Sequence, residues 1–303
     1  MSSYHVPVLL HESVDGLNMN PDGVYVDVTF GGGGHSREIL NRLSSKGKLI
    51  AFDQDGDAKQ NLFLDDKRFE FVPQNFEYLK NYCRLLGYQQ VDGILADLGV
   101  SSHQFDEAHR GFSIRFDAEL DMRMNCSGGQ LTAKDIINTY SESDLHKIFG
   151  IYGEVKNAKT VAKTIVTARL NSPISHVEQL KGILFNLAPR AKQNQYFAQI
   201  FQALRITVNR ELEVLQQFLE QSAQILKPNG RLVVISYHSL EDRLVKNFVL
   251  KGKFHGEAER DLYGNVLTPL VQVSRGAIVA SDIEIQRNSR ARSAKLRIAE
   301  KRN

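Results

Sequence analysis

The chain of 303 residues is 42% apolar and carries a formal net charge of +3, a composition that indicates a globular protein of one large or two ordinary domains. No apolar run approaches the roughly 20 residues of a membrane-spanning helix, and residues 1–7 lack the basic start of a signal peptide, so we expect a cytoplasmic protein without membrane contact. The two cysteines, Cys83 and Cys126, have no metal-binding spacing, and we expect neither a metal site nor a disulfide.

Strand-like and helix-like segments alternate through the first hundred residues. Four short runs rich in β-branched or aromatic residues lie at 24–30, 48–52, 68–72 and 91–96, and each of the first three is followed by a stretch with helical spacing of apolar residues. This alternation is typical of βαβ units. We therefore expect an α/β fold with a parallel sheet and helices on both faces.

The first run leads into four glycines at 31–34, after which residues 37–43 have a helical pattern. Such a loop lets a ligand approach the backbone and allows positive φ angles, although it is also compatible with a flexible turn. The dinucleotide fingerprint Gly-x-Gly-x-x-Gly would need glycine at position 36 or 37, where the chain has Ser36 and Arg37. A dehydrogenase is therefore disfavoured.

Polar residues at the ends of later strands favour a nucleoside cofactor. Asp53 ends the second run about 20 residues beyond the glycines, where a carboxylate accepts hydrogen bonds from ribose hydroxyls. Asp55 is an alternative, although we expect it to cap the next helix. Phe76 opens the helix after the third run, where it packs against adenine or belongs to the core. Asp97 ends the fourth run at the same edge of the sheet, and an acidic site suits a sulfonium cation better than a pyrophosphate.

The strand–helix alternation stops near Gln104. Helical patterns without intervening strands follow, at 132–138, 141–149, 153–170 and 175–187. A long helix is expected over 196–226, ended by Lys227-Pro228-Asn229-Gly230, with further strands at 231–236 and 294–300. Residues 251–280 have no clear pattern. A helical module thus interrupts the sheet.

Three further groups of residues are candidates for substrate contact. Tyr237 and His238 follow a strand, where the ring could stack on a base and the imidazole relay a proton; the alternative is an ordinary turn with Ser239 as helix cap. Arg123 holds phosphate or pairs with Asp121. From Arg287 onward the chain has seven Lys or Arg residues against one acid, a net charge of +6 that suits phosphate contact or a solvated end, with candidates Arg290, Arg292 and Lys295.

Eight blocks of the chain, in order, resemble one family, the bacterial 16S rRNA cytosine-N4 methyltransferases of the RsmH or MraW type. They are residues 5–10, 29–36, 92–102, 110–113, 120–124, 200–206, 236–243 and 289–297. Small departures occur at His103, Tyr237 and Ala291. Because unrelated blocks match in the right order over nearly the whole chain, the resemblance is more specific than any single motif.

The resemblance implies a Rossmann-like class I methyltransferase sheet interrupted by an inserted all-helical domain. The expected divisions are 1–104 for the first part of the methyltransferase domain, 105–200 for a helical substrate-recognition domain and 201–303 for the remainder with its basic segment. The implied cofactor is S-adenosylmethionine, and the family's contacts with it fall on Gly33, Gly34, His35, Asp53, Phe76, Asp97 and Gln104.

The implied reaction is methylation of the exocyclic amine of a cytidine in the decoding region of 16S rRNA, within the small ribosomal subunit. The catalytic candidates are Asp97, Tyr237 and His238, and either Asp97 or carbonyls of the 98–101 loop accept hydrogen bonds from the amine. The Asp/Asn-Pro-Pro-aromatic motif of many amine methyltransferases is absent here. The alternatives are a methyltransferase of the same fold acting on DNA or protein, and a ribosome-assembly factor that binds RNA without essential catalysis. The sequence leaves open whether the protein is a monomer or a homodimer.

Overall fold

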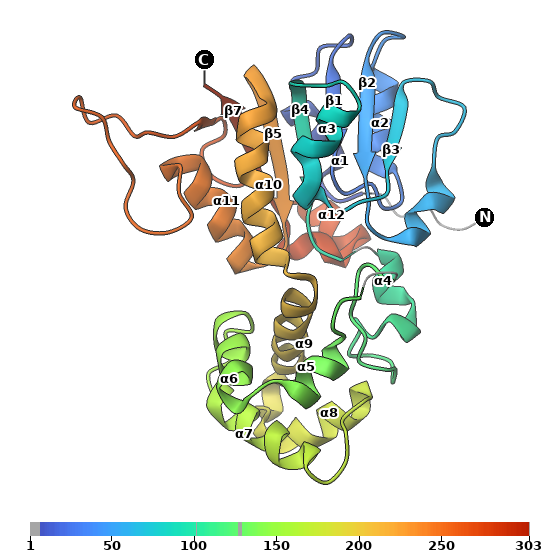
Figure 1. The fold of residues 1–303 in the computed structure, drawn as a ribbon, viewed down its shortest axis with the longest axis vertical. Helices are drawn as coiled ribbons and strands as arrows, with labels where there is room; N and C mark the ends of the chain where they lie inside the picture. Colours follow the sequence, from blue (N-terminus) through green and yellow to red (C-terminus); the bar gives the residue numbers. More distant parts are fainter. Residues whose placement is uncertain (1–6, 101, 127–128, 303) are drawn as a thin grey trace. The chain divides into compact units, whose positions relative to one another are not determined.

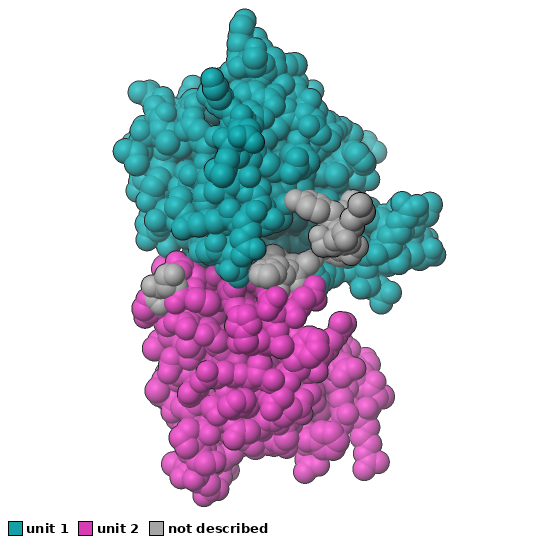
Figure 2. All heavy atoms as spheres, turned by 90° about the vertical axis from the view of Figure 1, so that its right-hand side faces the viewer, with its two compact units in different colours: residues 1–99, 212–303 teal, residues 100–211 magenta. Residues whose placement is uncertain are grey.

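The computed structural model describes residues 7–100, 102–126 and 129–302. These residues form two compact units, shown in different colours in Figure 2. Unit 1 consists of residues 1–99 and 212–303, and unit 2 consists of residues 100–211. Unit 2 is therefore an insertion in the sequence of unit 1.

Unit 1 is built on a seven-stranded sheet of order β3-β2-β1-β4-β5-β7-β6 (Figure 1). Strands β1 to β5 pair in parallel, whereas β7 pairs antiparallel with both β5 and β6. The strands are β1 (Val24–Asp27), β2 (Lys48–Phe52), β3 (Phe69–Val72), β4 (Val91–Asp97), β5 (Leu226–Ser236), β6 (Leu270–Gln272) and β7 (Lys295–Lys301). This sheet confirms the predicted Rossmann-like α/β fold.

Helices cover both faces of the sheet. Neighbouring residues along a strand point to opposite faces, so Ile94 packs with helices α3, α10 and α11, whereas Leu95 packs with α1 and α2. The helices are α1 (Leu10–Gly16), α2 (Gly34–Arg42), α3 (Leu79–Leu85), α10 (Glu211–Ile225), α11 (Ser239–Lys251) and α12 (Asp282–Arg287). Two buried apolar layers thus hold the strand ends in fixed positions.

One expectation for the second half of the chain was wrong, and one element had not been predicted. The predicted helix over 196–226 is two helices, because Arg210 adopts a left-handed conformation with φ of 51° and ends the first of them. Strand β6 lies in the stretch left without assignment, where its three residues are too few to show a periodic pattern.

Unit 2 is helical among its described residues, with its own apolar core. It contains α4 (Ser102–Asp106), α5 (Ala133–Thr139), α6 (Glu142–Ile151), α7 (Ala158–Arg169), α8 (Val177–Leu184) and α9 (Gln193–Asn209). Thr132 and Ser141 cap α5 and α6 through their side chains, as these residues do at helix starts. The boundary predicted at residue 200 falls inside α9.

Short 3₁₀ helices connect the larger elements. They are η1 (Gly56–Asn61), η2 (Phe76–Tyr78), η3 (Ala108–Arg110), η4 (Phe185–Leu187), η5 (Arg190–Lys192) and η6 (Ser289–Ser293). No helix in the described part of the chain has the length and hydropathy needed to span a membrane.

Candidate active site

The glycine loop joins the end of β1 to the start of α2, beside the point where the strand order reverses between β1 and β4. Open α/β sheets bind ligands at such a point, at the carboxyl ends of the strands. Gly33 is the N-cap of α2 with φ of 74°, and a Cβ there would lie 2.9 Å from Cζ of Phe63. A Cβ on Gly34 would lie 2.1 Å from Cγ of Pro7. Close packing around the loop therefore requires glycine at both positions.

Asp53 fixes the glycine loop from the end of β2. Its Oδ2 accepts a hydrogen bond from the Gly31 N–H at 2.7 Å, and its Oδ1 accepts one from the Asp55 N–H at 2.8 Å. Burial raises the pKa of Asp53 to about 6, although both hydrogen bonds oppose the shift. Asp55 caps η1 by accepting the Asp57 N–H, which confirms its expected role. Asp53 is thus the acid positioned beside the loop.

Asp27, which sequence reasoning did not single out, is the most buried acid of this edge, with no exposed surface. Its carboxylate accepts hydrogen bonds from Oγ of Ser36 at 2.6 Å and from the Thr29 N–H at 3.1 Å. Burial raises its pKa, and the charge of His35 opposes the shift. One acid inside an apolar strand directly before a glycine loop was the signal that could have identified it.

Asp97, His35 and Tyr237 come together at the end of β4. The Tyr237 hydroxyl donates to Oδ1 of Asp97 at 2.7 Å, whereas Oδ2 of Asp97 lies 3.8 Å from Nδ1 of His35. Nε2 of His35 lies 3.2 Å from the Val8 carbonyl oxygen, which can only accept, so Nε2 carries a proton. Burial raises the pKa of Asp97 to about 6, with His35 and Tyr237 opposing the shift. Burial and the Asp97 charge raise the pKa of Tyr237, which keeps its hydroxyl a donor.

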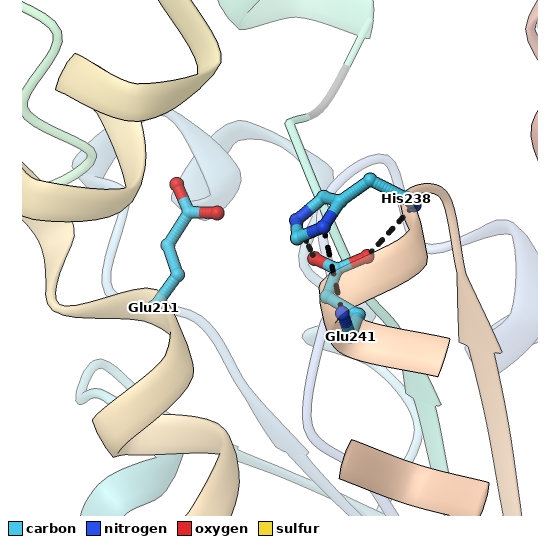
Figure 3. A group of neighbouring side chains, drawn as sticks. All are labelled: Glu211, His238 and Glu241. Carbon is cyan, nitrogen blue, oxygen red and sulfur yellow. Dashed lines mark hydrogen bonds and ion pairs between the residues drawn. The ribbon is translucent and has the colours of Figure 1, made fainter. Parts of the chain in front are cut away.

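His238 and Glu241 form a buried pair at the start of α11 (Figure 3). Nε2 of His238 lies 3.1 Å from Oε1 of Glu241, and Oε2 of Glu241 accepts the Tyr237 N–H at 2.9 Å. The N-cap is His238, so the alternative in which Ser239 caps this helix was wrong. Glu211, also drawn in Figure 3, belongs to unit 2, where it pairs with Arg205 at 2.9 Å. Within unit 1, Glu241 therefore orients the segment that presents Tyr237.

Three other predicted contacts with cofactor or substrate are packed or paired within their own units. Phe76 meets the Phe218 ring edge-on at 5.3 Å between centroids. Gln104 is buried in unit 2. Arg123 of the same unit makes a bidentate ion pair with Asp121, in which Nε donates to Oδ1 at 2.8 Å and Nη2 donates to Oδ2 at 2.7 Å.

The basic segment after Arg287 is largely part of the fold. Asp242 holds both Lys295, at 3.2 Å, and Arg297, at 2.7 Å, and these two ion pairs lower its pKa against the effect of burial. Arg290 is half-buried in η6, whereas Arg292 is exposed. Arg292 thus has the freest side chain of the three predicted phosphate contacts in this segment.

The acidic side chains at the carboxyl edge of the sheet fit a cationic nucleoside cofactor. Three carboxylates, those of Asp27, Asp53 and Asp97, end three adjacent strands, and burial raises the pKa of each. A bound cation would favour their ionised forms, whereas a pyrophosphate would meet like charge. The carboxylate of Asp53 lies next to the glycine loop, where the ribose hydroxyls of such a cofactor would find an acceptor.

We expect Asp97→Asn to stabilise the protein without cofactor at neutral pH. Asn is isosteric with the protonated acid, and its oxygen still accepts from Tyr237. Because the folded pKa of about 6 exceeds the unfolded value of 3.8, wild-type stability falls relative to the variant as pH rises from 4 to 6. The difference reaches about 3 kcal/mol at most.

Thermal unfolding measured between pH 4 and 8 checks this expectation. The variant should have the higher Tm at pH 8 and nearly the wild-type Tm at pH 4. A Tm difference independent of pH would mean that Asp97 does not titrate near 6.

Comparison with known proteins places the chain in a family. The model of the MraW methylase family matches residues 2–302. The ribosomal RNA small subunit methyltransferase H of Cytophaga hutchinsonii is 61% identical, over 98% of this chain and 99% of its own. The protein of the same name from Christiangramia forsetii is 58% identical, over 99% of both chains. A solved rRNA methylase structure from Streptococcus thermophilus covers 99% of both chains with a TM-score of 0.43 and 14% identity.

Proposed function

The chain belongs to the MraW methylase family, and from this premise we propose that it transfers a methyl group from S-adenosylmethionine to the N4 amine of a cytidine in the decoding region of 16S rRNA. The observation that carries the proposal is the cluster of Asp97, His35 and Tyr237 beside the glycine loop of unit 1. The names of relatives that match over nearly the full chain support small-subunit rRNA as the substrate class.

The cofactor site of the proposal lies along the glycine loop. Gly33 and Gly34 contact the cofactor through their main-chain atoms, Asp53 accepts hydrogen bonds from its ribose, and Phe76 packs against its adenine. His35 and Asp97 complete the contacts within unit 1. When bound, the cofactor provides an electrophilic methyl on a sulfonium, which the buried acids favour electrostatically.

Asp97 is the proposed acceptor for the amine. Its Oδ1 is held by the Tyr237 hydroxyl at 2.7 Å, while Oδ2 lies beyond hydrogen-bond distance from His35, at 3.8 Å. Oδ2 is therefore free to accept a hydrogen bond from the N4 amine of the cytidine. This hydrogen bond favours localisation of the lone pair on the nitrogen, away from the cytosine ring, so that it can attack the methyl group. Tyr237 and His238 orient the Asp97 carboxylate and the cytosine ring of the substrate. Carbonyls of the 98–101 loop are the alternative acceptor, although Ser101 lies outside the described residues.

The remaining parts of the proposal concern RNA recognition. The inserted helical domain, predicted at 105–200, recognises the substrate, and Arg123, Arg290, Arg292 and Lys295 contact its phosphates. The reaction takes place in the cytoplasm on the small ribosomal subunit. Because phosphate contacts position RNA without reading its sequence, selection of one cytidine falls to the side chains around Asp97.

A labelling experiment tests the proposal. Purified protein and S-adenosylmethionine with a radiolabelled methyl are incubated with methylation-deficient small subunits, free 16S rRNA, DNA and bulk protein. We expect label in 16S rRNA, on N4 of cytidine after nuclease digestion. Label only in DNA or protein would overturn the substrate assignment, and RNA binding without label would favour an assembly factor.

A further inference from the structure

Positive charge is segregated within unit 2. Residues 155–210 contain nine Lys or Arg residues and one acid, Glu178, whereas the other acids of this unit lie before residue 155 or at Glu211. Segregation of this kind creates a local positive potential that net charge conceals. The excess belongs to α7, α8, α9 and their connections.

Six of these cations are exposed, and five of them lie in or beside α7 and η5. We name these five the α7–η5 basic face: Lys156, Lys159, Lys163, Arg190 and Lys192. The buried residues of α7 include Val161, Ala162 and Ile165, so its packed side faces the unit core. Lys159 and Lys163 are four residues apart and therefore lie on one side of the helix, with Lys156 just before its first turn. Lysine side chains thus line the solvent side of α7.

Asn157 brings the two parts of the face together. Its Nδ2 donates to the Leu187 carbonyl oxygen at 3.4 Å, and its Oδ1 accepts from the Tyr196 hydroxyl at 3.2 Å. Arg190 and Lys192 lie between these two contacts in the chain, so η5 is held near the start of α7. Phe185, in the adjoining η4, is 55% exposed and adds an aromatic ring beside the charges.

Within the described ranges, none of the five cations has an acidic partner, in contrast to other lysines of the same unit. Lys134 pairs with Glu119 at 2.7 Å and Lys147 with Asp144 at 3.5 Å. The first turns of α5, α6 and α8 contain acids, as the helix dipole favours, whereas those of α7 and α9 contain none. The cations near these two helix starts therefore oppose the dipole, which is a cost that a bound anion would remove.

We propose that the α7–η5 basic face binds the phosphate backbone of the RNA substrate. The inference rests on the proposed function for the identity of the polyanion, and it adds a surface distinct from the basic segment after Arg287. Spacing of several cations along a helix suits a chain of phosphates better than one small anion, and Phe185 suits stacking with an unpaired base. The face contributes affinity without reading sequence.

The test compares two double variants that remove the same charge. Lys159→Ala/Lys163→Ala removes two cations of the face, and Lys134→Ala/Lys147→Ala removes two that pair with acids. Binding to a 16S rRNA fragment is measured by filter retention at several salt concentrations, with circular dichroism to confirm folding. We expect the first variant to bind several-fold more weakly and to lose about 1.5 to 2 from the slope of log K against log salt, with the second near wild type.

A turnover assay adds a second readout, in which the first variant should raise KM for small subunits and leave kcat unchanged. Equal salt slopes for the two variants would overturn the inference, as would weakened binding to polyglutamate without any change for RNA. The proposed function fails separately, if wild-type protein places no label in RNA while its salt-dependent binding still requires Lys159 and Lys163.

Discussion

Asp97→Asn is expected to lower kcat for RNA methylation by about 10²- to 10⁴-fold, the range that a positioned proton acceptor contributes. The neutral amide still accepts from Tyr237, so the side chain stays in place, but it presents NH₂ where Oδ2 would accept the amine proton. Single-turnover methylation at saturating cofactor measures the effect. In wild type the rate should fall below pH about 6, because protonation of Asp97 removes the acceptor.

Tyr237→Phe is the control for this prediction. It removes the 2.7 Å hydrogen bond to Oδ1 and leaves the carboxylate, so we expect a smaller loss of kcat and a shift of the pH profile to higher pH. Unchanged turnover in Asp97→Asn, with wild-type cofactor affinity, would move the acceptor role to the carbonyls of the following loop.

Asp53→Ala is expected to raise the Kd for S-adenosylmethionine by about 100-fold, since two hydrogen bonds to a charged acceptor contribute about 1.5 kcal/mol each or more. The substitution also leaves the N–H groups of Gly31 and Asp55 without their acceptor, which loosens the loop. Calorimetric titration measures the affinity. In wild type, binding should weaken as pH falls below about 6, where Asp53 becomes protonated.

Two further substitutions serve as comparisons for the loss of affinity in Asp53→Ala. Asp53→Asn keeps one oxygen acceptor and should fall between wild type and Asp53→Ala. Asp55→Ala removes the cap of η1 and should cost about 1 kcal/mol of stability while cofactor affinity stays within a few-fold. If Asp55→Ala weakened binding as much as Asp53→Ala, the ribose would be held by Asp55 instead.

The spacing of apolar residues was sufficient to predict the repeating strand–helix units of the sheet. The apolar runs predicted β1 to β4 and most of β5, because buried strands leave a continuous apolar signal. The same reasoning identified Asp53 and Asp97, which stand where those runs end. It failed at Arg210, since a single non-glycine residue in the left-handed region leaves no trace in apolar spacing.

Partnerships between distant residues were beyond sequence reasoning. The link from Tyr237 to Asp97 spans 140 positions, and only the adjacency of β4 and β5 makes it visible. Lys295 looked like a free cation in the sequence, yet Asp242, 53 positions away, holds it. In the sequence, Asp27 could not be distinguished from other residues of its strand. In the structure it is completely buried, and the Ser36 hydroxyl supplies a hydrogen bond to its carboxylate.

The position of β7 between β5 and β6 has a consequence for biosynthesis. The ribosome makes this strand after the other six, yet it occupies an interior place in the sheet rather than an edge. The nascent chain must therefore keep β5 and β6 apart, with the strand edges that β7 will occupy unpaired, while unit 2, whose residues are contiguous, can already fold. We expect nascent unit 1 to be the species that engages chaperones.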